Sequence, residues 1–204
     1  MLLQIHPDNP QERLLEQVVT CLKKGGIIIY PTDTIYGIGC DIYNKDAIER
    51  ICKIKNISPK KANFSFICSD LTHLSKFASQ LDNPTYRFLK NNIPGAFTFI
   101  LDANKEVPKM LKTNKDTVGI RVPDNKICKM LVDMLGNPIM STSLPQPDDE
   151  VETFTDPEVI QERFGHLVDL VIDAGPGNIQ SSTVIDLTDG EPQIIREGAG
   201  KISV

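Results

Sequence analysis

Small hydroxyl and cationic side chains follow short apolar segments at four places in this sequence. They lie in residues 31–37, 53–55, 139–143 and 181–183, the last with Arg196 nearby in the chain. Open α/β sheets usually bind their ligands at strand ends, and hydroxyl, ammonium and guanidinium groups there can donate hydrogen bonds to phosphate oxygens. The four segments therefore point to a site for an anionic ligand.

Each segment also has a purely structural interpretation. Residues 31–37 suit a helix-capping loop, and Lys53 and Lys55 complement the dipole at a helix C-terminus, which contributes about 0.3–1 kcal/mol. The hydroxyls of residues 141–143 can bond their own turn, and Arg196 can pair with an internal carboxylate. The residues alone leave both interpretations open.

Several familiar kinds of site are missing from the sequence. It has no Gly-x-Ser-x-Gly nucleophile elbow, no GxxxxGK[ST] phosphate loop and no GxGxxG fingerprint. The three histidines are scattered, with no cysteine or second histidine at ligand spacing, so we expect no metal site. A nucleotide, if bound, is bound in another way.

The composition is that of an ordinary globular protein. The chain has 204 residues and a net charge of −5, without a signal-like N-terminus or an apolar run near the ~20 residues of a transmembrane helix. Its five cysteines lack Cys-x-x-Cys spacing, which predicts buried, unpaired thiols in a reducing compartment. We expect a cytoplasmic protein with no membrane partner.

Charge is unevenly spread along the chain. Positive charge gathers in residues 50–61 and 105–129, whereas residues 148–173 are strongly acidic. This polarity permits an anionic ligand at one face, although solvated surfaces would produce the same counts.

Short apolar segments predict strands that alternate with helices. Residues 11–24 carry leucine and valine at helical spacing, and Asn44 is expected to cap a helix that ends near Lys55. Thr155 and Glu158 have the spacing of a capping box. Strands are expected at residues 2–6, 27–30, 63–68, 97–101, 117–121, 139–143, 170–172, 183–187 and 193–196, and further helices at 71–79, 84–91 and 126–135. This order predicts one α/β domain, residues 1–204, with a twisted mixed sheet.

Taken together and in this order, the segments resemble the YrdC/YciO family, and most of all its YciO branch. The resemblance runs through GGIIIYPTDTIYGIGCD, NNIPGAFTFIL, TVGIRVP, PIMSTS, SSTVIDL and IREGAG. It implies a single α/β domain whose twisted sheet surrounds a large basic cavity, without the appended C-terminal domain of longer members. It also implies threonylcarbamoyl-AMP synthase chemistry, a nucleotidyl transfer that converts L-threonine, bicarbonate and ATP into threonylcarbamoyl-AMP and pyrophosphate. That product serves tRNA modification, and family members are also associated with double-stranded RNA.

The resemblance assigns roles to individual residues. Lys55 and Arg196 would act in catalysis at the phosphates, with Mg²⁺ accompanying ATP. Thr32, Thr98 and Arg121 would bind threonine. The nucleotide or its AMP part would be bound by Lys55, Ser141, Ser143, Ser182 and Arg196.

Two positions depart from the family pattern. Ile57 stands where the family's Lys-x-Arg motif has arginine, and Ser143 stands where its Ser-x-Asn motif has asparagine. A guanidinium offers a planar fork of donors that a lysine does not replace. Two alternatives to the synthase therefore stay open: a tRNA- or double-stranded-RNA-binding protein of the same fold without synthase activity, and altered carbamoyl-nucleotide chemistry. The acidic loop at residues 145–154 is the candidate lid.

Overall fold

A single sheet organises the molecule. A computed structural model of the chain describes residues 1–58, 62–113, 115–145 and 154–203. Within these residues ten strands pair in the spatial order β1 (Leu2–Gln4), β8 (Leu170–Asp173), β2 (Ile28–Tyr30), β3 (Gly37–Asp41), β7 (Ile139–Ser143), β4 (Ser65–Ile67), β6 (Thr117–Arg121), β5 (Phe97–Asp102), β9 (Thr183–Asp186) and β10 (Gln193–Arg196).

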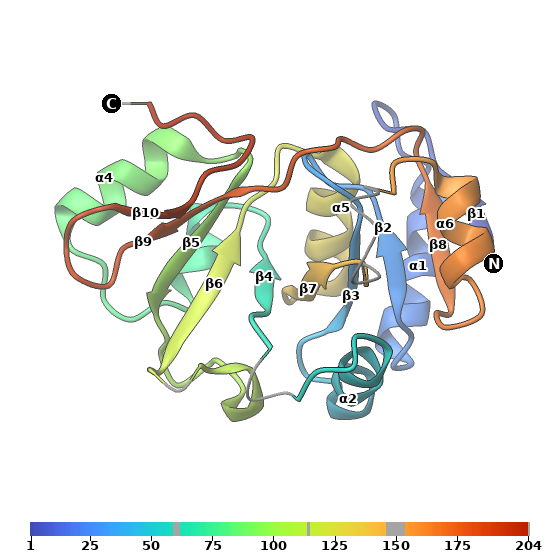
Figure 1. The fold of residues 1–204 in the computed structure, drawn as a ribbon, viewed down its shortest axis with the longest axis horizontal. Coiled ribbons are helices and arrows are strands. Elements are labelled where there is room, and N and C mark those ends of the chain that lie inside the picture. The colour runs from blue at the N-terminus through green and yellow to red at the C-terminus, as the bar shows by residue number, and fades with distance from the viewer. Residues whose placement is uncertain (59–61, 114, 146–153, 204) are drawn as a thin grey trace.

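The sheet is mixed and strongly twisted, as the sequence predicts. Strands β1 and β2 run parallel to β8, as β4 does to β6 and β5 to β9, whereas the other neighbouring pairs are antiparallel. Figure 1 shows β8 and β2 toward one end of the molecule and β5, β9 and β10 toward the other, with β3, β7 and β4 between them. The predicted α/β fold class is confirmed.

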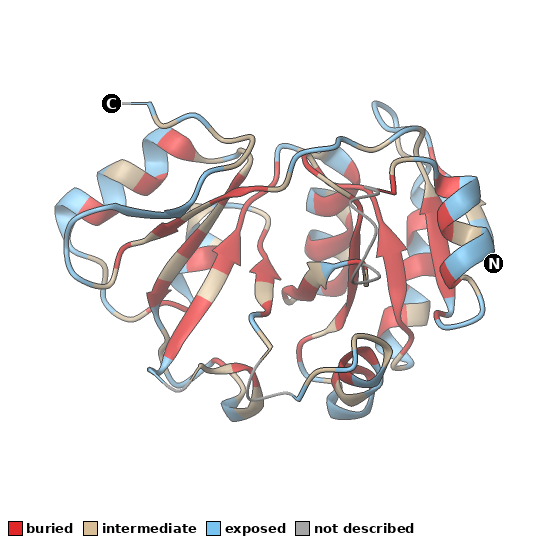
Figure 2. Ribbon diagram, viewed as in Figure 1, coloured by how far each residue is buried: buried red, intermediate tan, exposed pale blue. Residues whose placement is uncertain are grey.

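Helices cover both faces of the sheet. They are α1 (Glu12–Lys23), α2 (Lys45–Ile54), α3 (Leu71–Ser75), α4 (Asn83–Asn92), α5 (Lys126–Leu135) and α6 (Pro157–Phe164). Alternate residues of a strand face opposite sides. Ile28 and Tyr30 of β2 accordingly join the core under α1 and α5, whereas Ile27 and Ile29 join the core that holds α2, α3, α4 and α6. Figure 2 shows buried residues concentrated on the strands and on the helix faces turned toward them.

Helix ends follow local side-chain chemistry. Asn44 caps α2, because its Oδ1 accepts a hydrogen bond from the Ala47 amide at 2.9 Å, and this predicted cap is confirmed. The predicted Thr155 cap of α6 is wrong. Asp156 occupies the cap, and its Oδ1 accepts from the Glu158 amide at 2.9 Å.

One strand of the sheet is not among those predicted. Residues 37–41 form β3, although the sequence pattern predicted a loop up to Gly37 and no strand after it. A Cβ at position 39 would lie 2.4 Å from the Met140 carbonyl oxygen, so glycine is required there by the close approach of β7. The glycine that imitates a turn signal is therefore a packing requirement inside the sheet.

The cysteines are unpaired, as predicted. Cys40, Cys52, Cys68 and Cys128 are buried, and Cys21 is half-buried. Burial raises the pKa of each of these thiols, which keeps them protonated and unreactive. Across the described residues, no helix combines the length and the apolar character that a membrane crossing needs.

Candidate active site

A cavity of about 390 Å³ opens between distant parts of the chain. Its walls come from the loop after β2, from the middle strands β3, β4, β6 and β7, and from β5, β9 and β10 toward the end of the sheet. Most of its polar side chains are hydroxyls, and Arg121 and Arg196 are the cations that line it among the described residues.

The pleat of the strands explains which side chains face the cavity. Side chains on one face recur at every second residue, so positions 117, 119 and 121 of β6 and 141 and 143 of β7 line the cavity, where Thr142 also contributes. Ser65 of β4 pairs with Gly119 on one side and with Ser141 on the other. Strand register therefore assembles hydroxyls and a guanidinium from three neighbouring strands.

Arg121 is held rigidly at one wall. The residue is 8% exposed, and its Nη2 donates to Asp33 Oδ1 at 2.8 Å and to Thr34 Oγ1 at 2.9 Å. Asp33 is fixed in turn, because its Oδ2 accepts from the Asp124 amide at 3.1 Å. The buried Nε of Arg121 has no hydrogen-bond partner among the described residues. Arg121 therefore presents an unused donor in a wall that cannot easily move.

Burial changes the chemistry of the Asp33 carboxyl. Desolvation raises its pKa, and the Arg121 cation and backbone amides oppose that shift only in part. The ion pair between the two side chains still forms, since each is about nine-tenths buried and the two lie at 2.8 Å. Among the described residues Asp33 is the one charge partner of Arg121, so the N–H groups that Asp33 and Thr34 do not use remain for an anion in the cavity.

Arg196 lines the cavity from β10 and is held more loosely. It ends the edge strand β10, just after a register shift from Ile194. Its Nη2 donates to the Ser182 carbonyl oxygen at 2.9 Å, and Ser182 Oγ lies 2.8 Å from Thr98 Oγ1. Burial and the Arg121 cation lower the pKa of Arg196. Two guanidinium groups near each other create a positive potential that favours an anion.

The third cation, Lys55, lies at the edge of the cavity. It is the C-cap of α2, and its Nζ donates to the Ser143 carbonyl oxygen at 2.6 Å and to Ser143 Oγ at 3.2 Å. Burial lowers the pKa of Lys55. Deeper in the cavity, Ser141 Oγ accepts from the buried Tyr30 hydroxyl at 2.5 Å. A lysine, a serine and the end of β7 therefore meet at one side of the opening.

The structure brings most of the predicted site residues together. The cavity is lined by Thr98, Arg121, Ser141, Ser143, Ser182 and Arg196. Lys55 is not part of that lining, but it donates a hydrogen bond to Ser143, which is. Thr32 is not part of that lining, and its Oγ1 donates to the Ile35 carbonyl oxygen at 2.8 Å and accepts from the Thr34 amide at 3.0 Å. The roles of these residues stay predictions.

Sequence reasoning missed two residues that shape the site. Thr34, rather than Thr32, lines the cavity, and Asp33 positions Arg121. Both belong to the PTDTIYG segment, so an acid flanked by two threonines after a buried strand was the available signal. The proposed lid falls mostly on residues 146–153, which lie outside the described part of the chain.

The chain matches one family model and is similar to several known proteins over most of its length. A model of the Sua5/YciO/YrdC family, described as "Telomere recombination", matches residues 20–198. The chain belongs to this family. "Uncharacterized protein YciO" of Escherichia coli K12 is 48% identical over 199 residues, which are 97% of this chain and 95% of YciO. The "Threonylcarbamoyl-AMP synthase" of Coxiella burnetii RSA 493 is 30% identical over 178 residues, 87% of this chain and 94% of the synthase.

Solved structures of the family share the fold. The crystal structure of E. coli YciO matches with a TM-score of 0.91 and 46% identity, covering 98% of this chain and 97% of that one. Sua5 from P. abyssi, solved with L-threonine, matches with a TM-score of 0.85 and 24% identity, covering 97% of this chain and 57% of Sua5. At that identity the Sua5 match shows the fold alone. The predicted resemblance to the family, with YciO as a near relative, is confirmed.

Proposed function

We propose that the cavity binds L-threonine and ATP and that the protein makes threonylcarbamoyl-AMP and pyrophosphate, with bicarbonate as the third substrate. The observation that carries the proposal is the pair of guanidinium groups, Arg121 and Arg196, which line one hydroxyl-rich cavity close enough for one cation to lower the pKa of the other. A carboxylate at one arginine and a phosphate at the other would make use of both. A synthase 30% identical over 87% of the chain supports this assignment.

In this proposal Arg121 holds the substrate carboxylate. Its Nε is an unused donor, and its orientation is fixed by Asp33. Thr98, on the neighbouring strand β5, would donate through its hydroxyl, and Thr32 would act by ordering the loop that carries Thr34. A planar guanidinium in a fixed position suits bidentate recognition of a carboxylate.

The nucleotide is assigned to the opposite side of the cavity. Arg196 and Ser182 would bind phosphate oxygens there, with Ser141 and Ser143 on the β7 side. Lys55 reaches the cavity edge at Ser143, where it could exchange its bond to the Ser143 carbonyl for a phosphate oxygen. Hydroxyl and cationic donors in one place match the needs of a phosphate chain.

The reaction needs positioning and charge neutralisation rather than a protein nucleophile. The threonine amine takes up bicarbonate as a carbamate and releases water. One carbamate oxygen then attacks the α-phosphorus of ATP, and the bond to pyrophosphate breaks. Lys55 and Arg196 would stabilise the negative charge that develops on the phosphates.

Mg²⁺ was expected beside ATP, and the chain's own residues do not fit a resident magnesium site. Mg²⁺ prefers carboxylates together with phosphate oxygens. The described lining of the cavity supplies hydroxyls and no carboxylate, and no group of three acidic, histidine or cysteine side chains gathers elsewhere in the described chain. Charge neutralisation by the protein therefore rests on Lys55, Arg121 and Arg196.

Pyrophosphate release tests the proposal directly. The purified protein is given ATP, L-threonine and bicarbonate with Mg²⁺, and each substrate is then left out in turn. Release that requires both threonine and bicarbonate is the expected result. Lys55→Ala should abolish release, whereas Lys53→Ala, an exposed lysine on the same helix, should not. Equal rates in the two variants would remove Lys55 from the mechanism.

A second candidate is favoured by Ile57 and Ser143, which replace the arginine and asparagine of the family pattern. It is carbamoyl-nucleotide chemistry in the same cavity without synthesis from ATP. AMP binding without pyrophosphate release would support it over the synthase.

The RNA-binding alternative has its own test. RNA affinity that falls steeply with salt would favour the RNA-binding alternative, because phosphate contacts release counterions.

A further inference from the structure

A second cavity lies at the carboxyl ends of two neighbouring parallel strands. It has a volume of about 490 Å³, and it shares no lining residue with the first cavity. Strands β4 and β6 run parallel there, and their chains leave toward opposite faces of the sheet. The helix after β4, α3, joins one hydrophobic core, and the helix after β6, α5, joins the other.

This arrangement is a topological switch point. Where connections leave adjacent parallel strands in opposite directions, a crevice forms outside the strand ends, and open α/β sheets bind ligands in such crevices. The residues that follow the two strands, Ser69 and Asp70 after β4 and residues 122–126 after β6, line this one. The end of α4 closes its third side with Lys90, Ile93 and Pro94.

The floor of the crevice is apolar. Val122 and Pro123 are buried beneath it, and Leu71 and Ile93 are half-buried at its sides. Tyr86 stands at the edge with 44% of its surface exposed. An exposed tyrosine beside an apolar floor can cover a flat apolar group and still keep its hydroxyl in water.

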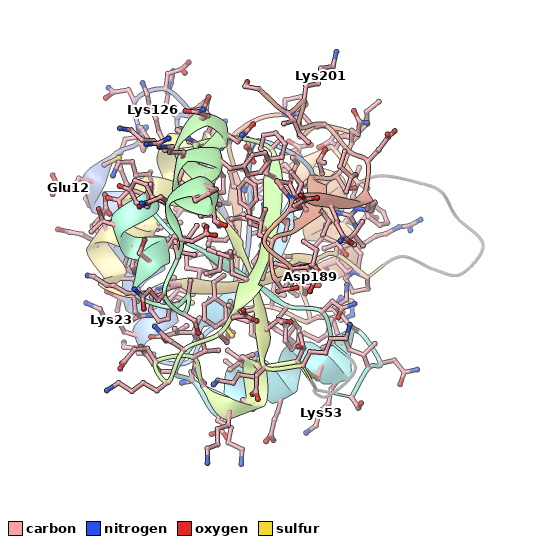
Figure 3. The ribbon with its side chains drawn as sticks, turned by 90° about the vertical axis from the view of Figure 1, so that its left-hand side faces the viewer. Glu12, Lys23, Lys53, Lys126, Asp189 and Lys201 are labelled. Carbon is pink, nitrogen blue, oxygen red and sulfur yellow. The ribbon has the colours of Figure 1, made fainter. Side chains whose placement is uncertain are left out.

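The rim of the crevice is basic. Lys90, Lys126 and Lys129 line it, together with the first turn of the ten-residue helix α5. Figure 3 shows Lys126 beside one end of the α4 helix. Lys126 Nζ donates to the Asp8 carbonyl oxygen, and Lys129 is paired with Asp133 at 2.8 Å on the exposed surface.

Two acids also line the crevice, Asp70 and Asp124. Asp70 caps α3 by accepting from the His73 amide at 2.7 Å, and Asp124 is exposed. Asp133 neutralises Lys129, so Lys90 and Lys126 stand against Asp70 and Asp124, and the excess positive potential comes from the N-terminus of α5. The shape, the apolar floor and the charge together fit an anionic group carried on an apolar body.

We propose that this crevice is a second binding site, for a small organic anion that carries a carboxylate or a phosphate on an aromatic or aliphatic body. The apolar body lies over Val122, Pro123 and Tyr86. The anionic group lies between Lys90 and the first turn of α5. The site stands apart from the proposed synthase reaction, because the two cavities have separate walls.

The test is an NMR titration of the ¹⁵N-labelled protein with phenyl phosphate, with benzoate and with neutral benzyl alcohol. The two anions distinguish a phosphate from a carboxylate, and the alcohol measures the apolar contribution alone. Saturable shifts of the Asp124, Asn125 and Lys126 amides by at least one anion are expected, with benzyl alcohol binding more weakly. Shifts confined to Ser141, Ser182 and Arg196 would place the anion in the first cavity and overturn the proposal.

A matched pair of variants tests the rim. Lys90→Gln should weaken anion binding by about two- to fivefold, as expected for an exposed charge. Lys23→Gln is the control, because Lys23 is likewise an exposed lysine in the last turn of its helix, α1, and lies outside the lining. Equal effects of the two variants, or benzyl alcohol binding as tightly as the anions, would show that the crevice does not select for charge.

Discussion

The two arginines of the main cavity are held in opposite ways. Arg121 is in the middle of the sheet, 8% exposed, and bonded to a carboxylate and a threonine hydroxyl. Arg196 ends the edge strand β10, is exposed on its outer side, and is held by the Ser182 carbonyl and hydroxyl. The same side chain therefore serves once as a fixed donor and once as an adjustable one.

The difference teaches how one cavity can suit two parts of a ligand. A fixed guanidinium has already lost its conformational freedom, so it binds a small group of constant shape at little further entropic cost. A guanidinium at a sheet edge can follow a group that moves as bonds change. The proposed reaction needs both properties, since the threonine carboxylate stays unchanged while the phosphates separate.

The largest expected effect is the loss of stability when Arg121 loses its carboxylate partner, Asp33. Asp33→Ala leaves the Arg121 guanidinium buried without its carboxylate, which should lower the free energy of unfolding by about 3–5 kcal/mol. Urea unfolding measures this change. Glu49→Ala removes an exposed pair with Lys45 and should cost less than about 0.5 kcal/mol. A loss below about 1 kcal/mol for Asp33→Ala would mean that Arg121 is not held by that ion pair.

The next largest effect is the loss of AMP affinity when Arg196 is replaced. Arg196→Gln should leave the unfolding free energy almost unchanged and weaken AMP binding by about ten- to a hundredfold, because a hydrogen bond to a charged group contributes about 1.5–3 kcal/mol. Calorimetric titration with AMP measures the affinity. Arg87→Gln, an exposed arginine of α4, is the control. If Arg196→Gln lowered the free energy of unfolding as much as Asp33→Ala, the contrast between the two arginines would fail.

Much of the sheet was predictable from sequence, because its elements carry strong local signals. Strands β6, β7 and β10 begin and end where the apolar patterns do, and α5 begins after Asn125, which caps it, and ends at Gly136, whose φ is +86°. Such caps and breaks depend on neighbouring residues only. β3 was missed because the reason for Gly39 is a strand distant in sequence, β7.

The site was less predictable, since its geometry depends on strand order. Arg121 and Asp33 are 88 residues apart, and nothing local in either segment announces their ion pair. Most of the residues that the family resemblance named line the cavity, although their roles stay predictions, and the resemblance pointed to Thr32 of PTDT where Thr34 lines it. That choice depends on the path of the loop, in which Thr32 bonds back to Ile35 and Thr34 reaches Arg121.

A pH titration separates Lys55 from both arginines. Burial lowers the pKa of Lys55 below its usual 10.5, so its charge is lost at a pH where the arginines are still cationic. AMP stabilises the charged form, so affinity is highest below this pKa and falls as pH rises through it. We expect AMP affinity to fall by up to about tenfold as the pH rises above about 8 toward the usual lysine value of 10.5, a range in which the AMP phosphate, with a pKa of about 6, no longer titrates.

Lys55→Gln is the control for this titration. It should bind AMP more weakly than the unmodified protein near pH 8 and show little further change up to pH 10. Burial raises the pKa of Tyr36, which also lines the cavity, to about 12, so the tyrosine does not titrate in this range. An equal pH slope in both proteins would assign the titration to another group and leave Lys55 with a structural role at Ser143.

The smallest effect tests how the adjustable wall is organised. Thr98→Val removes the hydroxyl that lies 2.8 Å from Ser182 Oγ and keeps the shape of the side chain. AMP affinity should fall only about two- to tenfold, since a neutral hydrogen bond contributes about 0.5–1.5 kcal/mol. Thr113→Val, which removes a hydroxyl that lies 2.7 Å from Thr117 Oγ1 elsewhere in the same lining, is the matched control. If Thr98→Val weakened AMP as much as Arg196→Gln, the wall would owe its affinity to a fixed hydroxyl network, and Arg196 would be as rigidly organised as Arg121.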